Sequence, residues 1–139
     1  MFSRLAIALG IVPDLLPAEL VSHGATAKPS PPRETVDYGQ YLVEAASCRV
    51  CHNAQLTGGL HPLALPDEPV PPNLTRGGRL ADWSSGDFMR ALRTGMTREG
   101  RELDPAFMPW PAYSKMTDLE IRAIWKYLES LPRLPEGHA

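Results

Sequence analysis

The chain has 139 residues and a formal net charge of −2, and this length predicts a single domain. The charge argues against a nucleic-acid-binding protein, because such proteins usually carry a clear basic excess. The 15 prolines and 11 glycines predict a loop-rich fold with short helices. With only three Phe and three Trp, the protein-only core should be small, so a large apolar cofactor would help to complete it.

Residues 1–27 are predicted to be a signal peptide or an N-terminal membrane anchor. Arg4 precedes an apolar run over residues 5–12, and Ala-Thr-Ala at 25–27 fits a small-residue cleavage site. A spanning helix needs about 20 apolar residues, which this segment does not supply because Pro13 interrupts it. A mis-assigned start is a third alternative. Residues 28–36 then form a polar, Pro-rich linker.

The segment 37–47 is predicted to form the first helix. Asp37 is the expected N-cap, and one helical face is apolar, with Leu42, Val43, Ala45 and Ala46. We expect this helix to deliver Cys48 at its end.

The two cysteines of the chain, Cys48 and Cys51, lie three positions apart and are followed by His52. A structural disulfide framework is therefore excluded, and Cys-Arg-Val-Cys-His matches the C-x-x-C-H signature of haem c attachment. The two thiols would form thioethers with the two vinyl groups of haem, and the histidine would lie beneath the iron as its proximal ligand. The motif therefore predicts one covalently bound haem c.

Three other interpretations of the cysteine pair are weaker. A zinc site needs four ligands, whereas the remaining histidines, His23, His61 and His138, are scattered and no further cysteine exists. A thioredoxin-like pair expects a βαβ context, and no alternating strand pattern occurs in this sequence. The last alternative is a chance match that binds no haem.

The stretch 53–82 is predicted to be irregular. Its Gly58-Gly59 pair and its five prolines forbid a long helix or a central strand. A structureless loop of roughly 30 residues is unusual in a compact domain. Such a loop is reasonable if it wraps a cofactor.

A short helix is predicted from about Ser85 to Thr94. Ser84 or Ser85 can cap its start, and Gly95 can end it. The apolar side of this helix carries Phe88, Met89, Ala91 and Leu92.

A methionine is the expected sixth ligand, because its soft, neutral sulfur favours ferrous iron and raises the potential. Met108 is the predicted ligand, since it lies in a loop stiffened by prolines on both sides. Met89 is expected to fill the core, and Met116 to act as a hydrophobic staple before the last helix. Met96, and His61 in a bis-histidine site, are the outside alternatives.

The last helix carries the strongest local signal. Thr117-Asp118-Leu119-Glu120 is a capping box, with Thr117 at the N-cap and Glu120 at N3. Apolar residues then follow at helical spacing, and Pro132 ends the helix: Ile121, Ile124, Trp125 and Leu128.

These features together resemble a class I cytochrome c. The resemblance covers residues 37–133, the predicted cytochrome c domain, and leaves 134–139 as a C-terminal tail. Within the class, the sequence is similar to the haem domains of bacterial periplasmic dehydrogenase cytochrome subunits, such as those of alcohol or gluconate dehydrogenases. Five stretches carry the resemblance: residues 38–52, 72–75, 83–95, 108–113 and 117–132.

The resemblance implies an all-α fold of three to four helices, with long loops wrapped around one covalent haem. It implies that the backbone carbonyl of Pro72 accepts the Nδ1–H of His52. Trp83 and Tyr113 would line the haem pocket or bond a propionate; plain core filling is the alternative for both residues.

The resemblance also implies that the first and last helices cross, with Gly39 permitting close approach of Trp125 or Tyr127. Six arginines lie close together in the sequence, and one of them is a candidate to neutralise a propionate. A mixed, solvated face and a redox-partner docking surface are the other interpretations. The six are Arg76, Arg79, Arg90, Arg93, Arg98 and Arg101.

The leading functional hypothesis is a single-electron carrier with His52/Met108 ligation and no catalysis of its own. The alternative is a haem-relay subunit of a larger dehydrogenase or oxidoreductase complex. A haem enzyme or gas sensor is the third hypothesis, which a bound Met108 would oppose. The expected partners are a dehydrogenase, an oxidase or another cytochrome, and not nucleic acid. The expected location is the periplasm, soluble or tethered through the N-terminus.

Overall fold

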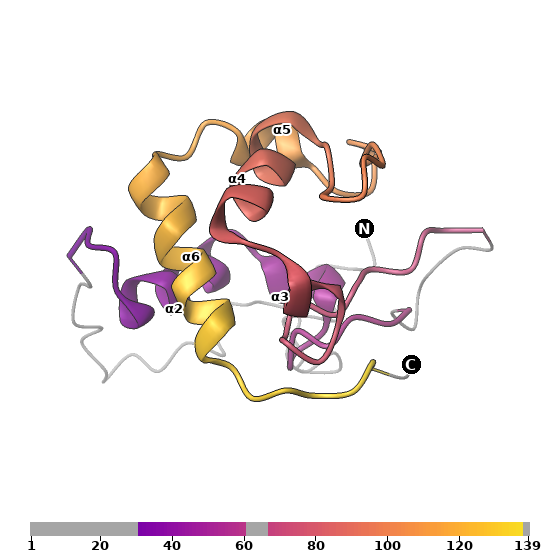
Figure 1. Cartoon of the computed structure of the whole chain (residues 1–139), viewed down its shortest axis with the longest axis horizontal. Coiled ribbons are helices and arrows are strands. Elements are labelled where there is room, and N and C mark those ends of the chain that lie inside the picture. The colour runs from indigo at the N-terminus through magenta and orange to yellow at the C-terminus, as the bar shows by residue number, and fades with distance from the viewer. Residues whose placement is uncertain (1–30, 61–66, 138–139) are drawn as a thin grey trace, which may run out of the picture.

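The computed structural model describes residues 31–60 and 67–137. The predicted N-terminal segment 1–27 and the ligand alternative His61 lie outside these residues. Apart from an isolated bridge between Met96 and Glu102, the described residues form no β-structure, which confirms the all-α prediction (Figure 1). The elements are α2 (Val36–Ala45), α3 (Cys48–His52), the 3₁₀ turn η2 (Arg79–Asp82), α4 (Ser85–Thr94), α5 (Trp110–Tyr113) and α6 (Asp118–Ser130). In the described part of the chain, every helix is too short or too polar to cross a membrane.

Helix α2 begins one residue earlier than the sequence predicts. Thr35 is its N-cap, because the Thr35 hydroxyl accepts a hydrogen bond from the backbone N–H of Tyr38 at 3.3 Å. The prediction that Asp37 caps this helix is therefore wrong. Asp37 lies instead in the first turn, where a carboxylate favours the positive end of the helix dipole.

Helix α2 also ends before the cysteine motif. It stops at Ala45, and Ser47 adopts a left-handed conformation with φ 58°. Because this conformation breaks the α-helical path, Cys48 begins the separate helix α3 rather than ending α2. The prediction that the first helix delivers Cys48 at its end is wrong in this respect.

The other two predicted helices are confirmed with their caps. Ser84 is the N-cap of α4, where it forms a capping box with Asp87, and Gly95 ends the helix in the left-handed region at φ 72°. Thr117 and Glu120 form the capping box of α6, as the sequence indicates. Two reciprocal bonds of this kind satisfy N–H groups that the helix itself leaves free.

The core lies between α6 and the two helices that it crosses. A Cβ built on Gly39 of α2 would lie 2.8 Å from the Cβ of Tyr127 and would overlap the carbonyl of Ala123, so only glycine allows this helix crossing. Trp125 instead packs on Phe88 of α4, with ring centroids 5.5 Å apart. Of the two predicted neighbours of Gly39, Tyr127 is therefore the one in closest contact.

Two short elements were not expected from the sequence. The 3₁₀ turn η2 interrupts the otherwise irregular loop that follows the cysteine motif. Helix α5 starts directly after Pro109 and contains Pro111 in its first turn. Proline is well tolerated there, because the first N–H groups of a helix have no intrahelical partner. Part of the predicted rigid loop around Met108 is therefore helical.

Candidate functional site

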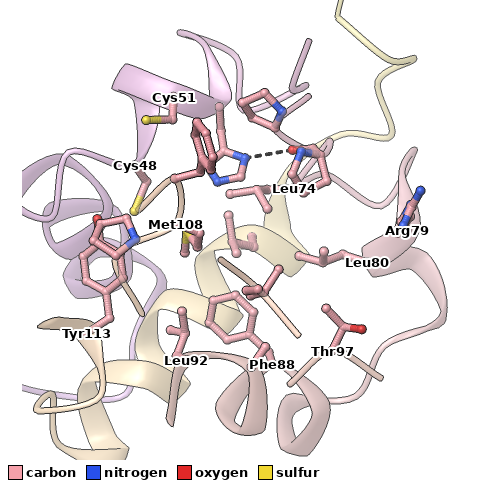
Figure 2. A pocket seen from close by; sticks show the side chains of 18 of the residues that line it. Cys48, Cys51, Leu74, Arg79, Leu80, Phe88, Leu92, Thr97, Met108 and Tyr113 are labelled. Atoms are coloured by element: carbon pink, nitrogen blue, oxygen red, sulfur yellow. Dashed lines mark hydrogen bonds between the residues drawn. The ribbon is translucent and has the colours of Figure 1, made fainter. Parts of the chain in front are cut away.

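A mainly apolar cavity of about 380 Å³ lies beside α3 and α4 (Figure 2). This volume falls in the range typical of small-molecule and cofactor sites. Figure 2 shows Cys48 and Cys51 at one side of the cavity, with Phe88 and Leu92 of α4 across from Cys51. All seven residues that the sequence singles out line this cavity: Cys48, Cys51, His52, Pro72, Trp83, Met108 and Tyr113.

Helix α3 brings the two thiols to the same wall of the cavity. Residues three apart lie on one face of a helix, and both Cys48 and Cys51 are free thiols. Cys48 is half-buried and Cys51 is exposed; burial raises the pKa of the Cys48 thiol to about 11. Two neighbouring free thiols at the edge of an apolar cavity fit a haem attached by thioethers.

His52 is held in one orientation at the end of α3. Its side chain is buried, and its Nδ1–H donates to the carbonyl of Pro72 at 2.8 Å, drawn as a dashed line in Figure 2. Burial lowers the pKa of His52, against the opposing effect of that hydrogen bond. The imidazole is therefore neutral at pH 7, with the proton on Nδ1 and the lone pair on Nε2. This is the tautomer that a metal-ligating histidine requires.

Met108 enters the same cavity from the segment before α5. Its backbone N–H donates to the carbonyl of Asp104 at 2.9 Å, and its carbonyl accepts from the N–H of Trp110 at 2.6 Å. Figure 2 shows the sulfur of Met108 among the side chains that line the cavity. Among the other methionines considered, Met116 also lines the cavity, whereas Met89 and Met96 do not.

Trp83 and Tyr113 contribute their rings to the cavity and direct their polar atoms to protein partners. The indole N–H of Trp83 donates to Glu99 Oε1 at 3.0 Å, and the Tyr113 hydroxyl donates to the carbonyl of Ala46 at 3.0 Å. The two bonds join residues 16 and 67 positions apart in the sequence. In this structure the two residues therefore shape the walls of the cavity.

The arginine-rich segment separates into two groups. Four of its members bond to other parts of the protein: Arg76 to Glu129, Arg90 to Asp87, Arg93 to Asp118 and Arg98 to the carbonyl of Asp82. Arg79 and Arg101 line the cavity instead and are exposed. Within the described ranges, neither of these two side chains forms a hydrogen bond or ion pair.

Sequence reasoning missed the role of Arg49, the first residue between the two cysteines. Its guanidinium bonds to Glu44 Oε1 at 2.6 Å, to the Tyr127 hydroxyl at 2.6 Å and to the carbonyl of Ala54. Arg49 therefore joins α3 to α2, to the loop that follows α3 and to α6. The sequence carries no signal for this role, because the two intervening residues of C-x-x-C-H are read only as spacing.

An all-helical domain with two free thiols and a neutral histidine around one apolar cavity is the arrangement of a small haem-binding protein. The sequence matches the family model for cytochrome c over residues 36–132, and the chain belongs to the cytochrome c family. Its cofactor is covalently bound haem c, the group with which proteins of this family transfer single electrons.

Several curated proteins are similar to this chain. The gluconate 2-dehydrogenase cytochrome c subunit of Pantoea cypripedii is 32% identical over 136 residues, covering 91% of this chain and 28% of that protein. The fructose dehydrogenase cytochrome subunit of Gluconobacter japonicus is 30% identical over 105 residues, covering 69% and 21%. The cytochrome c subunit of the quinone alcohol dehydrogenase of Gluconobacter oxydans (strain 621H) is 27% identical over 132 residues, covering 89% and 26%. The chain thus spans about a quarter of the length of these relatives.

Proposed function

We propose that His52 and Met108 would be the two protein side chains that hold the haem iron. The observation that carries this proposal is the hydrogen bond from His52 Nδ1–H to the Pro72 carbonyl, which leaves the Nε2 lone pair for a metal. Met108 supports it by lining the same cavity from a different segment of the chain. When bound, haem c supplies an iron centre that alternates between Fe(III) and Fe(II).

Each side chain of the proposed site has a separate task. The thiols of Cys48 and Cys51 tether the cofactor, so that a small domain does not lose it. The neutral imidazole of His52 is kept in one orientation by Pro72, which also increases its basicity as a ligand. The thioether of Met108 would favour the reduced state and would keep dioxygen from binding to the iron.

We also propose Arg79 and Arg101 as the partners of the haem propionates. Both side chains line the cavity, while the other four arginines of the segment are engaged elsewhere. A guanidinium can bind a carboxylate through two parallel hydrogen bonds. This charge pairing would keep the propionates from destabilising a largely apolar site.

The ligand proposal is tested by visible spectroscopy of the purified holoprotein. We expect a c-type spectrum with one haem per chain and the weak far-red band of Met–Fe(III) ligation. Met108→Ala should abolish this band and make the reduced protein bind carbon monoxide rapidly at neutral pH. Met116→Ala is the matched control, since Met116 also lines the cavity, and it should retain the band. A band that survives in Met108→Ala would refute the ligand assignment.

For the whole protein, we propose an electron relay to or from a dehydrogenase on the periplasmic side of the membrane. This proposal is supported by the three relatives described above, each of which is named as the cytochrome subunit of a dehydrogenase. In this arrangement another subunit holds the catalytic cofactor, and this chain only transfers electrons.

Affinity purification of the full chain from its native cells tests the relay proposal. We expect co-elution with a large subunit that contains flavin, quinone or molybdenum, and reduction of the haem when the substrate of that subunit is added. Stable isolation as a lone monomer that no dehydrogenase reduces would instead identify a free carrier. The periplasmic location is tested by selective release of the haem-stained protein with the periplasmic fraction.

A further inference from the structure

The segment that follows α6 packs back against the rest of the domain. In Figure 1 the yellow segment beyond α6 runs back beneath the loops that follow α3. We call residues 131–137 the C-terminal strap. Its Gly137 N–H donates to the carbonyl of Thr57 at 2.8 Å, and a Cβ built on Gly77 would lie 2.9 Å from the backbone nitrogen of Leu134. The strap is therefore closely packed on these loops.

Two fully buried polar side chains use the strap as their hydrogen-bond partner. Asn73 Nδ2 donates to the carbonyl of Leu134 at 2.8 Å, while Asn73 Oδ1 accepts from the N–H of Thr75 at 2.8 Å. The Leu134 N–H donates to Thr75 Oγ1 at 3.3 Å, and the Thr75 hydroxyl in turn reaches the Leu134 carbonyl at 3.4 Å. Both Asn73 and Thr75 have 0% exposure with the strap in place. The strap therefore supplies hydrogen-bond partners in a position that water does not reach, where an unpaired polar group is costly.

Asn73 directly follows the residue that orients the proximal histidine. The carbonyl of Pro72 accepts the Nδ1–H of His52, and it belongs to the peptide unit whose nitrogen is that of Asn73. Any displacement of Asn73 therefore moves this acceptor. The neighbouring contacts are equally tight, since the Leu74 N–H donates to the carbonyl of Leu56 at 2.8 Å.

We propose that the C-terminal strap, acting through Asn73, positions the Pro72 carbonyl and thereby tunes the His52 ligand. Asn73 is a positioning residue in this arrangement, because it does not itself line the cavity. The proposal rests on the proposed ligation of iron by His52. It adds that a segment some 60 residues further along the chain controls the strength of the His52–Pro72 hydrogen bond.

The test displaces the strap and leaves the side chains of the site unchanged. In Gly77→Ala the new Cβ would collide with Leu134, so the strap must move away. Gly86→Ala is the matched control, because its Cβ would meet only Ser84 Oγ at 3.7 Å. Thr75→Val is a second variant of nearly unchanged volume, which removes the hydroxyl bonds to Leu134 and covers the case in which Gly77→Ala does not fold.

Two readouts on the holoprotein report on the histidine. The exchange rate of the His52 Nδ1–H with solvent, measured by NMR in the reduced protein, should rise at least about tenfold in the strap variants, as expected when one buried hydrogen bond is weakened. The midpoint potential should shift to a more positive value, because a less basic imidazole stabilises Fe(III) less. Gly86→Ala should change neither quantity.

The strap proposal is overturned if Gly77→Ala or Thr75→Val accelerates exchange of the Gly137 amide but leaves both histidine readouts at wild-type values. Failure of the proposed function has a different signature. In that case the wild-type protein itself would lack the low-spin spectrum of His/Met ligation, whatever the strap variants do.

Discussion

The hydrogen bonds on the two sides of the cavity differ in how far apart in the sequence their partners lie. On the proximal side, residues 52–60 and 69–77, the bonds extend to the C-terminal strap, with Asn73 joined to a partner 61 positions away. On the distal side, residues 96–109, the bonds are mostly local: Leu103 N–H to the Gly95 carbonyl at 2.7 Å, and Trp110 Nε1–H to the Leu103 carbonyl at 3.0 Å.

This difference indicates which half of the site opens first. The distal side can separate from the cavity by breaking a few bonds within its own segment and to neighbouring residues. Opening of the proximal side would also disrupt the packing of the strap. Local opening reactions follow such differences in bonding density. Of the two proposed ligands, we therefore expect Met108 to be the more labile and His52 the more permanent.

The largest expected effect comes from a comparison of two glycines that have similar positive φ angles. Gly58 on the proximal side has φ +71° and Gly100 on the distal side has φ +78°. A Cβ on Gly58 would lie 2.6 Å from the Asn73 nitrogen, whereas a Cβ on Gly100 would meet no atom within 4 Å. Gly58→Ala should lower the free energy of unfolding by about 3 kcal/mol or more, and Gly100→Ala by only about 1 kcal/mol.

Urea unfolding of the two holoproteins, followed by circular dichroism, checks this prediction. Because the intrinsic cost of a positive φ is shared, the difference between the two variants isolates the packing of the proximal loop. Equal losses in the two proteins would show that this loop is no tighter than the distal segment.

The next largest effect concerns the hydrogen bonds that attach α3, the helix with the two cysteines, to α6. Arg49→Gln and Tyr127→Phe should each lower the free energy of unfolding by about 1–2 kcal/mol, because each removes part of a hydrogen-bonded cluster. The double variant should lose less than the sum of the two, since the residues contact each other. Arg90→Gln is the control, because its exposed pair with Asp87 is expected to contribute little. Strict additivity would contradict the proposed coupling.

A smaller effect is expected for opening of the distal side. Trp110→Phe removes the bond from the indole N–H to the Leu103 carbonyl, which should ease opening by about 1 kcal/mol. Added imidazole should then displace Met108 from the oxidised protein with roughly fivefold higher affinity. Spectroscopic titration with imidazole measures this change. Tyr127→Phe, which removes a bond between α6 and Arg49 of α3, should leave the affinity as it is, and an equal increase there would argue against separate opening.

The smallest effect is the response of the distal side to acid. The pKa of Glu99 is lowered, chiefly by a hydrogen bond from its own backbone N–H and then by the bond from Trp83. A carboxylate whose pKa is lowered in the folded state stabilises the fold at pH values above 4.5, its usual pKa. This stabilisation is lost as the pH falls through the pKa of the folded state. In thermal unfolding, the wild type should be more stable than Glu99→Gln by a few tenths of a kcal/mol at pH 7. This difference should shrink as the pH falls below 4.5. A gap that widens in acid would contradict the assignment.

Local patterns in the sequence predicted most of the helices. The capping box at Thr117 and Glu120 and the Gly95 stop depend on residues within one or two turns, so a short window contains all the necessary contacts. The end of α2 was missed, because the left-handed Ser47 is not a residue whose type announces that conformation. Helix α5 was missed as well, since its prolines read equally well as loop residues.

The candidate site divides in the same way. The spacing of Cys48, Cys51 and His52 determines their chemistry, because one turn of chain holds all three groups. The sequence could not reveal that Arg49 bonds to Tyr127, 78 positions away. Nor could it show that Arg79 lines the cavity without an ion pair to any residue that the structure describes. Such roles depend on which distant segments pack together.

The chain of residues alone was enough to predict the haem c cofactor, the proposed attachment at Cys48 and Cys51, and the helices with clear caps, since these follow from contacts between near neighbours. The tertiary structure decided which methionines reach the cavity, which arginines face it, and how the strap holds the loop behind His52. These features arise only after folding, because burial and hydrogen bonding across some 60 residues depend on how α6 packs on α2 and where the chain runs afterwards.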